Sequence, residues 1–187
     1  MSEMSEMAAA PKAGAVHFGG RLTVSHPNGR RTGSMAQFVL CPATQDEAGG
    51  VVVSVYPQKE TQGLVPLPPE FDMERGIEIR LSPVEVAECQ MVFRGYTEGV
   101  RDGNGFFHRK EDGTVVMTLS HAIEPTPGYR LSLTRRVGFG NDSRRDRVQI
   151  LLTIPEMYAL AGAIDGAMGY IAFGVPMAGL AGEGRGA

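Results

Sequence analysis

The feature that most constrains the fold of this chain is a strand–cap–helix junction that occurs twice, in residues 76–95 and 146–166. Each copy begins with alternating apolar residues, which predict a strand with one buried face. Each continues with Ser/Thr-x-x-Glu, the capping box in which hydroxyl and carboxylate bond the free backbone N–H groups at a helix start. The two boxes, Ser82 with Glu85 and Thr153 with Glu156, lie 71 residues apart.

Several strand-like runs precede each junction, so the pattern predicts an internal repeat of two ββββα units. In the first unit, the strand 32–41 offers Met35, Phe38 and Leu40 as core candidates. In the second, the last helix predicts one apolar face from Met157, Leu160, Ala161, Ile164 and Met168. We predict an α+β protein with a flexible arm at 1–14, a first unit at 15–100, a second unit at 101–170 that shares its core, and a Gly/Ala-rich tail at 171–187.

The composition excludes several classes of protein. No apolar run approaches the roughly 20 residues that span a bilayer, so we expect no membrane partner. The N-terminus lacks the features of a secretory signal, and Cys41 and Cys89 are expected to be free thiols, which favours a cytoplasmic protein. No His or Cys has zinc-ligand spacing, and no nucleophile elbow occurs. We therefore expect no cofactor, no metal and no enzymatic activity.

Charge is spread unevenly along the chain. Residues 45–100 contain ten acidic and four basic residues, whereas 101–147 contain nine basic and six acidic residues. The net charge of −3 counts against binding driven by a general basic field. Any anion-binding surface is therefore expected to be local, and in the second unit.

The tandem ββββα units, with the capped junctions LSPVE and LTIPE, resemble the single-stranded nucleic-acid-binding superfamily. This superfamily includes Whirly proteins, the PC4 coactivator, PUR-repeat proteins and the kinetoplastid guide-RNA-binding proteins. The resemblance covers roughly residues 16–170. It implies paired antiparallel sheets backed by helices, and binding of single-stranded DNA or RNA, with DNA favoured, across a sheet face and the hairpin tips. Besides single-stranded nucleic acid, a second copy of the chain is an expected partner, in a homo-oligomer.

Unpaired bases stack on aromatic rings while cations follow the phosphates. Two strands of the second unit and the loop after them combine both residue types. We expect Phe107 and Tyr129 to be core residues, because alternate aromatics in a strand usually are. For Phe106 and Phe139, core and binding roles remain open. The candidate nucleic-acid-binding residues are Phe106, His108, Arg109, Lys110, Arg130, Arg135, Arg136, Phe139, Arg144, Arg145 and Arg147.

Two other functions remain open. The same fold could serve as a protein-interaction or dimerisation module without nucleic acid, and an enzyme site could be assembled from loops 57–74 and 137–147. Arginines gathered on one sheet face, away from carboxylates, favour nucleic-acid binding. A flat acidic or apolar face favours the interaction module, and a deep pocket with convergent polar groups favours the enzyme.

Overall fold

The computed structural model describes residues 20–44, 47–60, 68–123, 126–138 and 143–174. Each half of the chain forms a four-stranded antiparallel sheet followed by a helix, and the strand orders are β1-β2-β3-β4 and β5-β6-β7-β8. This confirms the predicted α+β fold. The elements are β1 (Arg21–His26), β2 (Ser34–Cys41), β3 (Gly50–Pro57), β4 (Ile77–Leu81), α1 (Pro83–Phe93), the 3-10 helix η1 (Val100–Gly103), β5 (Phe106–Lys110), β6 (Gly113–Ala122), β7 (Gly128–Val137), β8 (Arg144–Thr153) and α2 (Ile154–Phe173).

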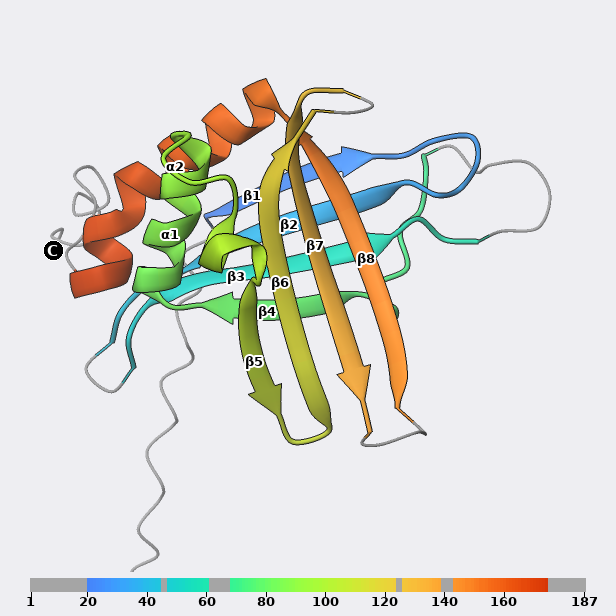
Figure 1. Cartoon of the computed structure of the whole chain (residues 1–187), viewed down its shortest axis with the longest axis horizontal. Helices are drawn as coiled ribbons and strands as arrows, with labels where there is room; N and C mark the ends of the chain where they lie inside the picture. The colour runs from blue at the N-terminus through green and yellow to red at the C-terminus, as the bar shows by residue number, and fades with distance from the viewer. Residues whose placement is uncertain (1–19, 45–46, 61–67, 124–125, 139–142, 175–187) are drawn as a thin grey trace, which may run out of the picture.

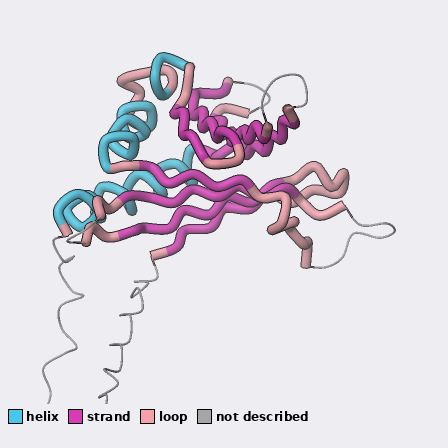
Figure 2. Tube along the Cα trace, turned by 90° about the horizontal axis from the view of Figure 1, so that it is seen from below, coloured by secondary structure: helices cyan, strands magenta, loops and turns pink. Residues whose placement is uncertain are grey.

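The two sheets form crossed layers. Figure 1 shows the sheet β5–β8 lying across the sheet β1–β4, and Figure 2 shows the two layers from the side. Helices α1 and α2 lie together at one side of the sheets and contact strands of both. The inner faces of the two sheets and the inner sides of the helices enclose one hydrophobic core. Each sheet is therefore left with one outer face.

The alternation in the repeated junction decides which strand positions enter this core. In β4, Ile77 and Leu81 are buried while Glu78 and Arg80 are exposed. In β8, Val148, Ile150 and Leu152 are buried in the same way. Because side chains alternate across a strand, the same parity rule assigns every residue of these sheets to a face.

Both predicted capping boxes are present. The backbone N–H and the hydroxyl of Ser82 donate to Glu85, each at 2.8 Å. Thr153 donates to Glu156 in the same way, at 2.8 and 2.7 Å. These contacts satisfy free groups at the start of α1 and α2, so the two helices begin at equivalent points of the repeat.

Helices α1 and α2 meet at equivalent positions of the repeat. Gln90 Nε2 donates to the backbone oxygen of Ala161 at 2.9 Å, and these residues are 71 positions apart. Arg94 pairs with Asp165 at 2.8 Å, again 71 positions apart. The helices therefore cross where each meets its own counterpart, as two units related by an approximate two-fold axis would.

Some details differ from the predictions. Phe38 is buried and Leu40 packs against the core, but Met35 faces the outer side of its sheet and is only half-buried. Its odd position gives it the opposite parity to Phe38, so the core prediction for Met35 was wrong. In α2, Met157, Leu160 and Ile164 are buried as predicted, with Ala161 and Met168 partly buried beside them. Helix α2 also continues to Phe173, beyond the predicted boundary at 170.

Candidate nucleic-acid interface

The outer face of the sheet β5–β8 carries five arginines, and we call it the arginine face. In Figure 1 this sheet lies in front of the sheet β1–β4, so its outer face is turned toward the viewer. The face consists of the alternate residues that point away from the core. Its arginines are Arg109 from β5, Arg130 and Arg136 from β7, and Arg145 and Arg147 from β8.

The strand register brings these arginines into rows across the sheet. Arg109 pairs with Thr114, Thr114 with Arg136, and Arg136 with Arg145. Arg136 and Arg145 are thus directly opposite each other on neighbouring strands. Directly opposed like charges destabilise a sheet. An anion bound between Arg136 and Arg145 would relieve the repulsion between their guanidinium groups.

A second row crosses the face beside the first. It contains Phe107, Val116, Thr134 and Arg147 in paired register. The Nε of Arg147 donates to Ser132 Oγ at 2.8 Å, which holds the guanidinium along the sheet. Residues of both rows, from Thr114, Arg136 and Arg145 in the first to all four of the second, line an open hollow of about 410 Å³.

Phe107 presents an aromatic ring to this hollow. Its side chain is 63% exposed, so the prediction that Phe107 belongs to the core was wrong. Tyr129 is buried as predicted, and its hydroxyl donates to the backbone oxygen of Phe93 at 3.3 Å. Of the two rings, only Phe107 is placed where a base could stack on it.

The arginine face is free of carboxylates among the described residues of its strands. Asp146 is the one acidic residue in β5–β8, and it lies on the inner side. Within the described part of the chain, the side chains of Arg109, Arg130, Arg136 and Arg145 make no hydrogen bond or ion pair with protein groups. Their positive charges remain available to a ligand.

The outer face of the sheet β1–β4 differs in charge. Ser54 Oγ donates to Glu78 at 2.9 Å, and Arg80 pairs with Glu47 at 3.0 Å. Acidic side chains thus lie on or beside this face, and one of them pairs with Arg80. The two outer faces are therefore not equivalent, although the two units share one topology.

Three of the predicted site residues point inward from β5. The ring of Phe106 is 1% exposed, and Arg101 Cζ lies 5.7 Å from its centroid. A ring so covered cannot stack on a base, so the structure decides the open question for Phe106 in favour of the core. His108 and Lys110 share its parity, and Lys110 Nζ donates to the backbone oxygen of Glu78 at 3.3 Å.

Two further predicted arginines have an acidic partner. Arg135 and Arg144 pair with Asp146 at 3.4 and 3.0 Å. Burial would raise the pKa of Asp146, but hydrogen bonds from Arg144 and Arg135 lower it below its usual range. This local neutralisation separates Arg135 and Arg144 from the arginine face. Phe139 lies outside the described residues.

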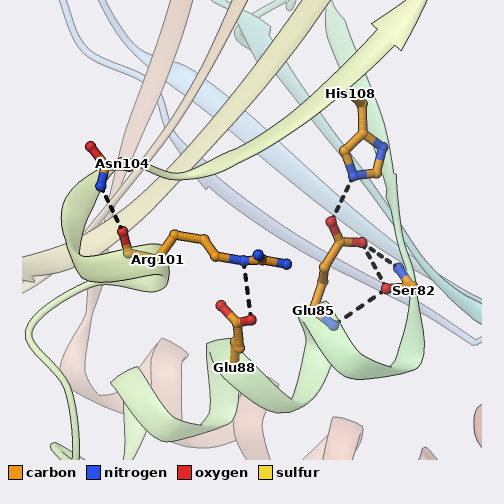
Figure 3. A network of polar contacts seen from close by, with 6 residues as sticks. All are labelled: Ser82, Glu85, Glu88, Arg101, Asn104 and His108. Carbon is orange, nitrogen blue, oxygen red and sulfur yellow. Dashed lines mark hydrogen bonds and ion pairs between the residues drawn. The ribbon is translucent and has the colours of Figure 1, made fainter.

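The predicted residue His108 takes part in a contact between the two units. Its Nε2 lies 2.8 Å from Glu85 Oε1, the carboxylate of the first capping box, as Figure 3 shows. Nearby, Arg101 pairs with Glu88 at 3.1 Å and fastens the linker to α1. The His108–Glu85 contact holds β5, and with it Phe107 and Arg109, against α1.

The second capping box has a matching contact. His26 Nε2, at the end of β1, lies 2.8 Å from Glu156 Oε1. Each capping glutamate is thus bound by a histidine from the first strand of the other unit. Burial would raise the pKa of Glu85 and Glu156, but the histidine hydrogen bonds, with those from Ser82 and Thr153, bring both pKa values below the usual range.

Acidification is therefore expected to destabilise the fold through these carboxylates. Because their folded pKa values are lowered, they stabilise the protein fully above their unfolded pKa, near 4.5, and lose this contribution as the pH falls through the folded pKa. Urea midpoints measured at about pH 7 and about pH 3 should fall less in Glu85→Gln/Glu156→Gln than in the unmodified protein. An equal fall would show that the two pairs do not contribute.

Four further observations concern the core, metal ligands, the helices and a cysteine. The enclosed space within the core is apolar and only about 20 Å³. Among the described residues, no cluster of three His, Cys, Asp or Glu side chains could hold a metal ion. No helix in this part of the chain is long and apolar enough to cross a membrane. Cys89 is buried, and burial raises the pKa of its thiol.

The fold and this face define an α+β protein of two ββββα units with one open, cationic sheet face. The same fold occurs in the Whirly protein WHY3 of Arabidopsis thaliana, at 13% identity and a TM-score of 0.62, covering 87% of this chain and 90% of that one. The plant transcriptional regulator PBF-2 matches at 14% identity and a TM-score of 0.61, covering 87% and 84%. A guide-RNA-binding protein complex bound to a gRNA matches at 14% and 0.50, covering 84% and 94%.

These likenesses show that the chain has a Whirly-like fold, as its sequence predicts. No protein-family model and no curated protein matches the sequence.

Proposed function

We propose that this protein binds single-stranded nucleic acid, DNA in preference to RNA, through the arginine face and without catalysis. The observation that carries the proposal is the cross-strand pair Arg136–Arg145, with Arg109 in the same row. Opposed like charges weaken a sheet, and functional sites are where such local costs are retained. A phosphate between the two guanidinium groups would turn the repulsion into two charge-assisted contacts.

The rest of the face suits an unpaired strand. Phe107 offers an exposed ring for one base, while Arg145 and Arg147 follow each other along β8 on the same side. Stacking on aromatic rings beside a cationic path is how proteins bind single strands with little sequence preference. His108 and Arg101 act through position only, by holding β5 and the linker against α1.

The structural likenesses support the same class of ligand. One similar solved structure is a guide-RNA-binding complex bound to a gRNA, and another is a plant transcriptional regulator. We keep DNA ahead of RNA because the resemblance to Whirly proteins implies that order.

Fluorescence anisotropy against a single-stranded oligonucleotide and its duplex, at several salt concentrations, tests the proposal. Single strands should bind more tightly than duplex, because bases already stacked on each other cannot stack on Phe107. Affinity for the single strand should fall with salt, with a log–log slope of roughly −0.7 per phosphate contacted. Equal binding of both forms, or no binding at low salt, would overturn the proposal. A DNA and an RNA strand of one sequence, measured side by side, test the preference for DNA.

A second candidate function is a protein-interaction or dimerisation module without nucleic acid. It is favoured by exposed apolar side chains on the helices, namely Val84 and Met91 on α1 and Tyr158 and Phe173 on α2. Exposed apolar side chains mark an interface where they form one contiguous patch. Sedimentation equilibrium measures self-association. The interaction module is supported if the protein self-associates while anisotropy shows no binding of single-stranded or duplex nucleic acid.

A further inference from the structure

A second hollow, of about 220 Å³, lies where the β1–β2 hairpin meets β8. One wall comes from hairpin residues 26–34, and the other from Arg130, Gln149 and Leu151 on β7 and β8. Leu151 is six residues along β8 from Arg145 and has the same parity, so at about 3.4 Å per residue the two lie about 20 Å apart. The hollow thus lies at the far end of the arginine face, several nucleotides from the Arg136–Arg145 row.

The walls of this hollow are fixed by specific contacts. Ser34 Oγ donates to the backbone oxygen of Gln149 at 2.7 Å, which joins the hairpin to β8. The side chain of Asn28 accepts from the backbone N–H groups of Arg30 and Thr32, both at 3.1 Å, and so orders the turn. At Gly33 a Cβ atom would clash with the backbone oxygen of His26, so only glycine fits this close approach.

Within these fixed walls, two polar side chains remain unused. Arg130 and Gln149 are exposed, and neither side chain bonds to any group in the described part of the chain. Gln149 pairs with Ser132 and Arg130 with Leu151, which makes Arg130 and Gln149 diagonal neighbours on one face. Such neighbours are within reach of a common ligand when their side chains are long.

We propose that this hollow binds one base of the strand and selects guanine. The proposal rests on the proposed function and assigns base preference to one end of the same surface. Guanine presents the acceptors O6 and N7, which an arginine binds with two parallel hydrogen bonds. Its Watson–Crick edge also presents N–H donors, and the carboxamide oxygen of Gln149 can accept a hydrogen bond from one of them. Adenine and the pyrimidines lack the O6/N7 pair, so they leave Arg130 without its two-fold contact.

A substitution series in the oligonucleotide tests this selection. Anisotropy at low salt would compare oligothymidine of about 15 nucleotides with the same strand carrying one central guanine. The guanine strand should bind about tenfold more tightly, the usual value of one bidentate base contact. Replacing the guanine by adenine, or by 7-deazaguanine, which lacks N7, should remove most of this gain.

Variants of the protein test whether Arg130 and Gln149 cause the preference for guanine. Arg130→Lys keeps the charge but cannot form the bidentate contact, so it should remove most of the guanine preference, and Gln149→Ala should reduce it. Arg80→Lys, the same exchange on the outer face of the first sheet, should leave the preference unchanged. If the unmodified protein binds both strands equally, the guanine proposal fails while the proposed function stands. If it binds neither strand, both fail.

Discussion

Alanine at Phe106 is expected to destabilise the protein by about 3–5 kcal/mol, the usual range for removing a buried phenylalanine side chain. Alanine at the next residue, Phe107, should change stability by no more than about 0.5 kcal/mol, as for other exposed positions. The reason is their parity on β5, since Phe106 lies in the shared core at 1% exposure and Phe107 lies on the arginine face at 63%. Urea unfolding of the two variants measures the difference.

For single-strand affinity the order should be reversed, with the larger direct effect at Phe107. Phe107→Ala should weaken single-strand affinity by about 1–3 kcal/mol, the value of one lost base stack, with the salt slope nearly unchanged. Phe107→Leu, which stays apolar but lacks a π-face, should weaken binding comparably and serves as the matched control. Unchanged affinity in both Phe107 variants would remove the stacking role from Phe107.

Glutamate at Arg145 is expected to raise stability and to lower affinity at once. Arg145 is directly opposite Arg136, so Arg145→Glu replaces a repulsive cross-strand pair with an attractive one, worth roughly 0.2–1 kcal/mol. The same exchange removes a phosphate contact and adds a negative charge to the face. The salt slope for single strands should therefore flatten by about 0.7 or more, while the urea midpoint rises.

Arg144 provides the control for this prediction. It is adjacent in sequence but lies on the other side of β8, paired with Asp146. Arg144→Ala should leave the salt slope almost unchanged, because its charge is already neutralised locally. If Arg144→Ala flattens the slope as strongly as Arg145→Glu does, the binding path follows the hairpin tip and not the arginine face.

The sequence was sufficient for the architecture because local signals agreed with one another. Alternation in β4 and β8 identified the buried parity, and the capping boxes located the starts of α1 and α2 within one residue. The core prediction for Met35 was wrong because it relied on the apolar side chain alone and ignored that Met35 and Phe38 have opposite parity on β2. Apolar character alone does not distinguish the two faces of a strand.

The site was only partly predictable, and β5 shows why. Both parities of the segment 106–110 contain one phenylalanine and at least one basic side chain, so alternation within it cannot decide which side faces the core. The missing signal was in the hairpin. The two-residue turn pairs Lys110 with Gly113, which places Phe106 opposite Met117 on the clearly apolar parity of β6. Register, and not composition, was needed.

Other features depend on contacts that no local pattern contains. The bond between His108 and Glu85 joins elements 23 residues apart, and that between His26 and Glu156 joins elements 130 residues apart. His108 was predicted to bind nucleic acid, and for neither histidine did the carboxylate partner follow from the sequence. By contrast, alternation along β8 already places Asp146 with Arg144 and not with Arg145, which would have divided the arginine run correctly.

The crossing of α1 and α2 affects which halves of such a chain can associate. Arg94 and Asp165 occupy equivalent positions, yet they have opposite charges and meet at 2.8 Å. In a symmetric assembly of two identical halves, the same crossing would bring two arginines or two aspartates together, and like charges at that distance repel. Divergence of the two copies at this position therefore favours pairing of unlike halves over pairing of like ones, independently of the peptide link that joins them.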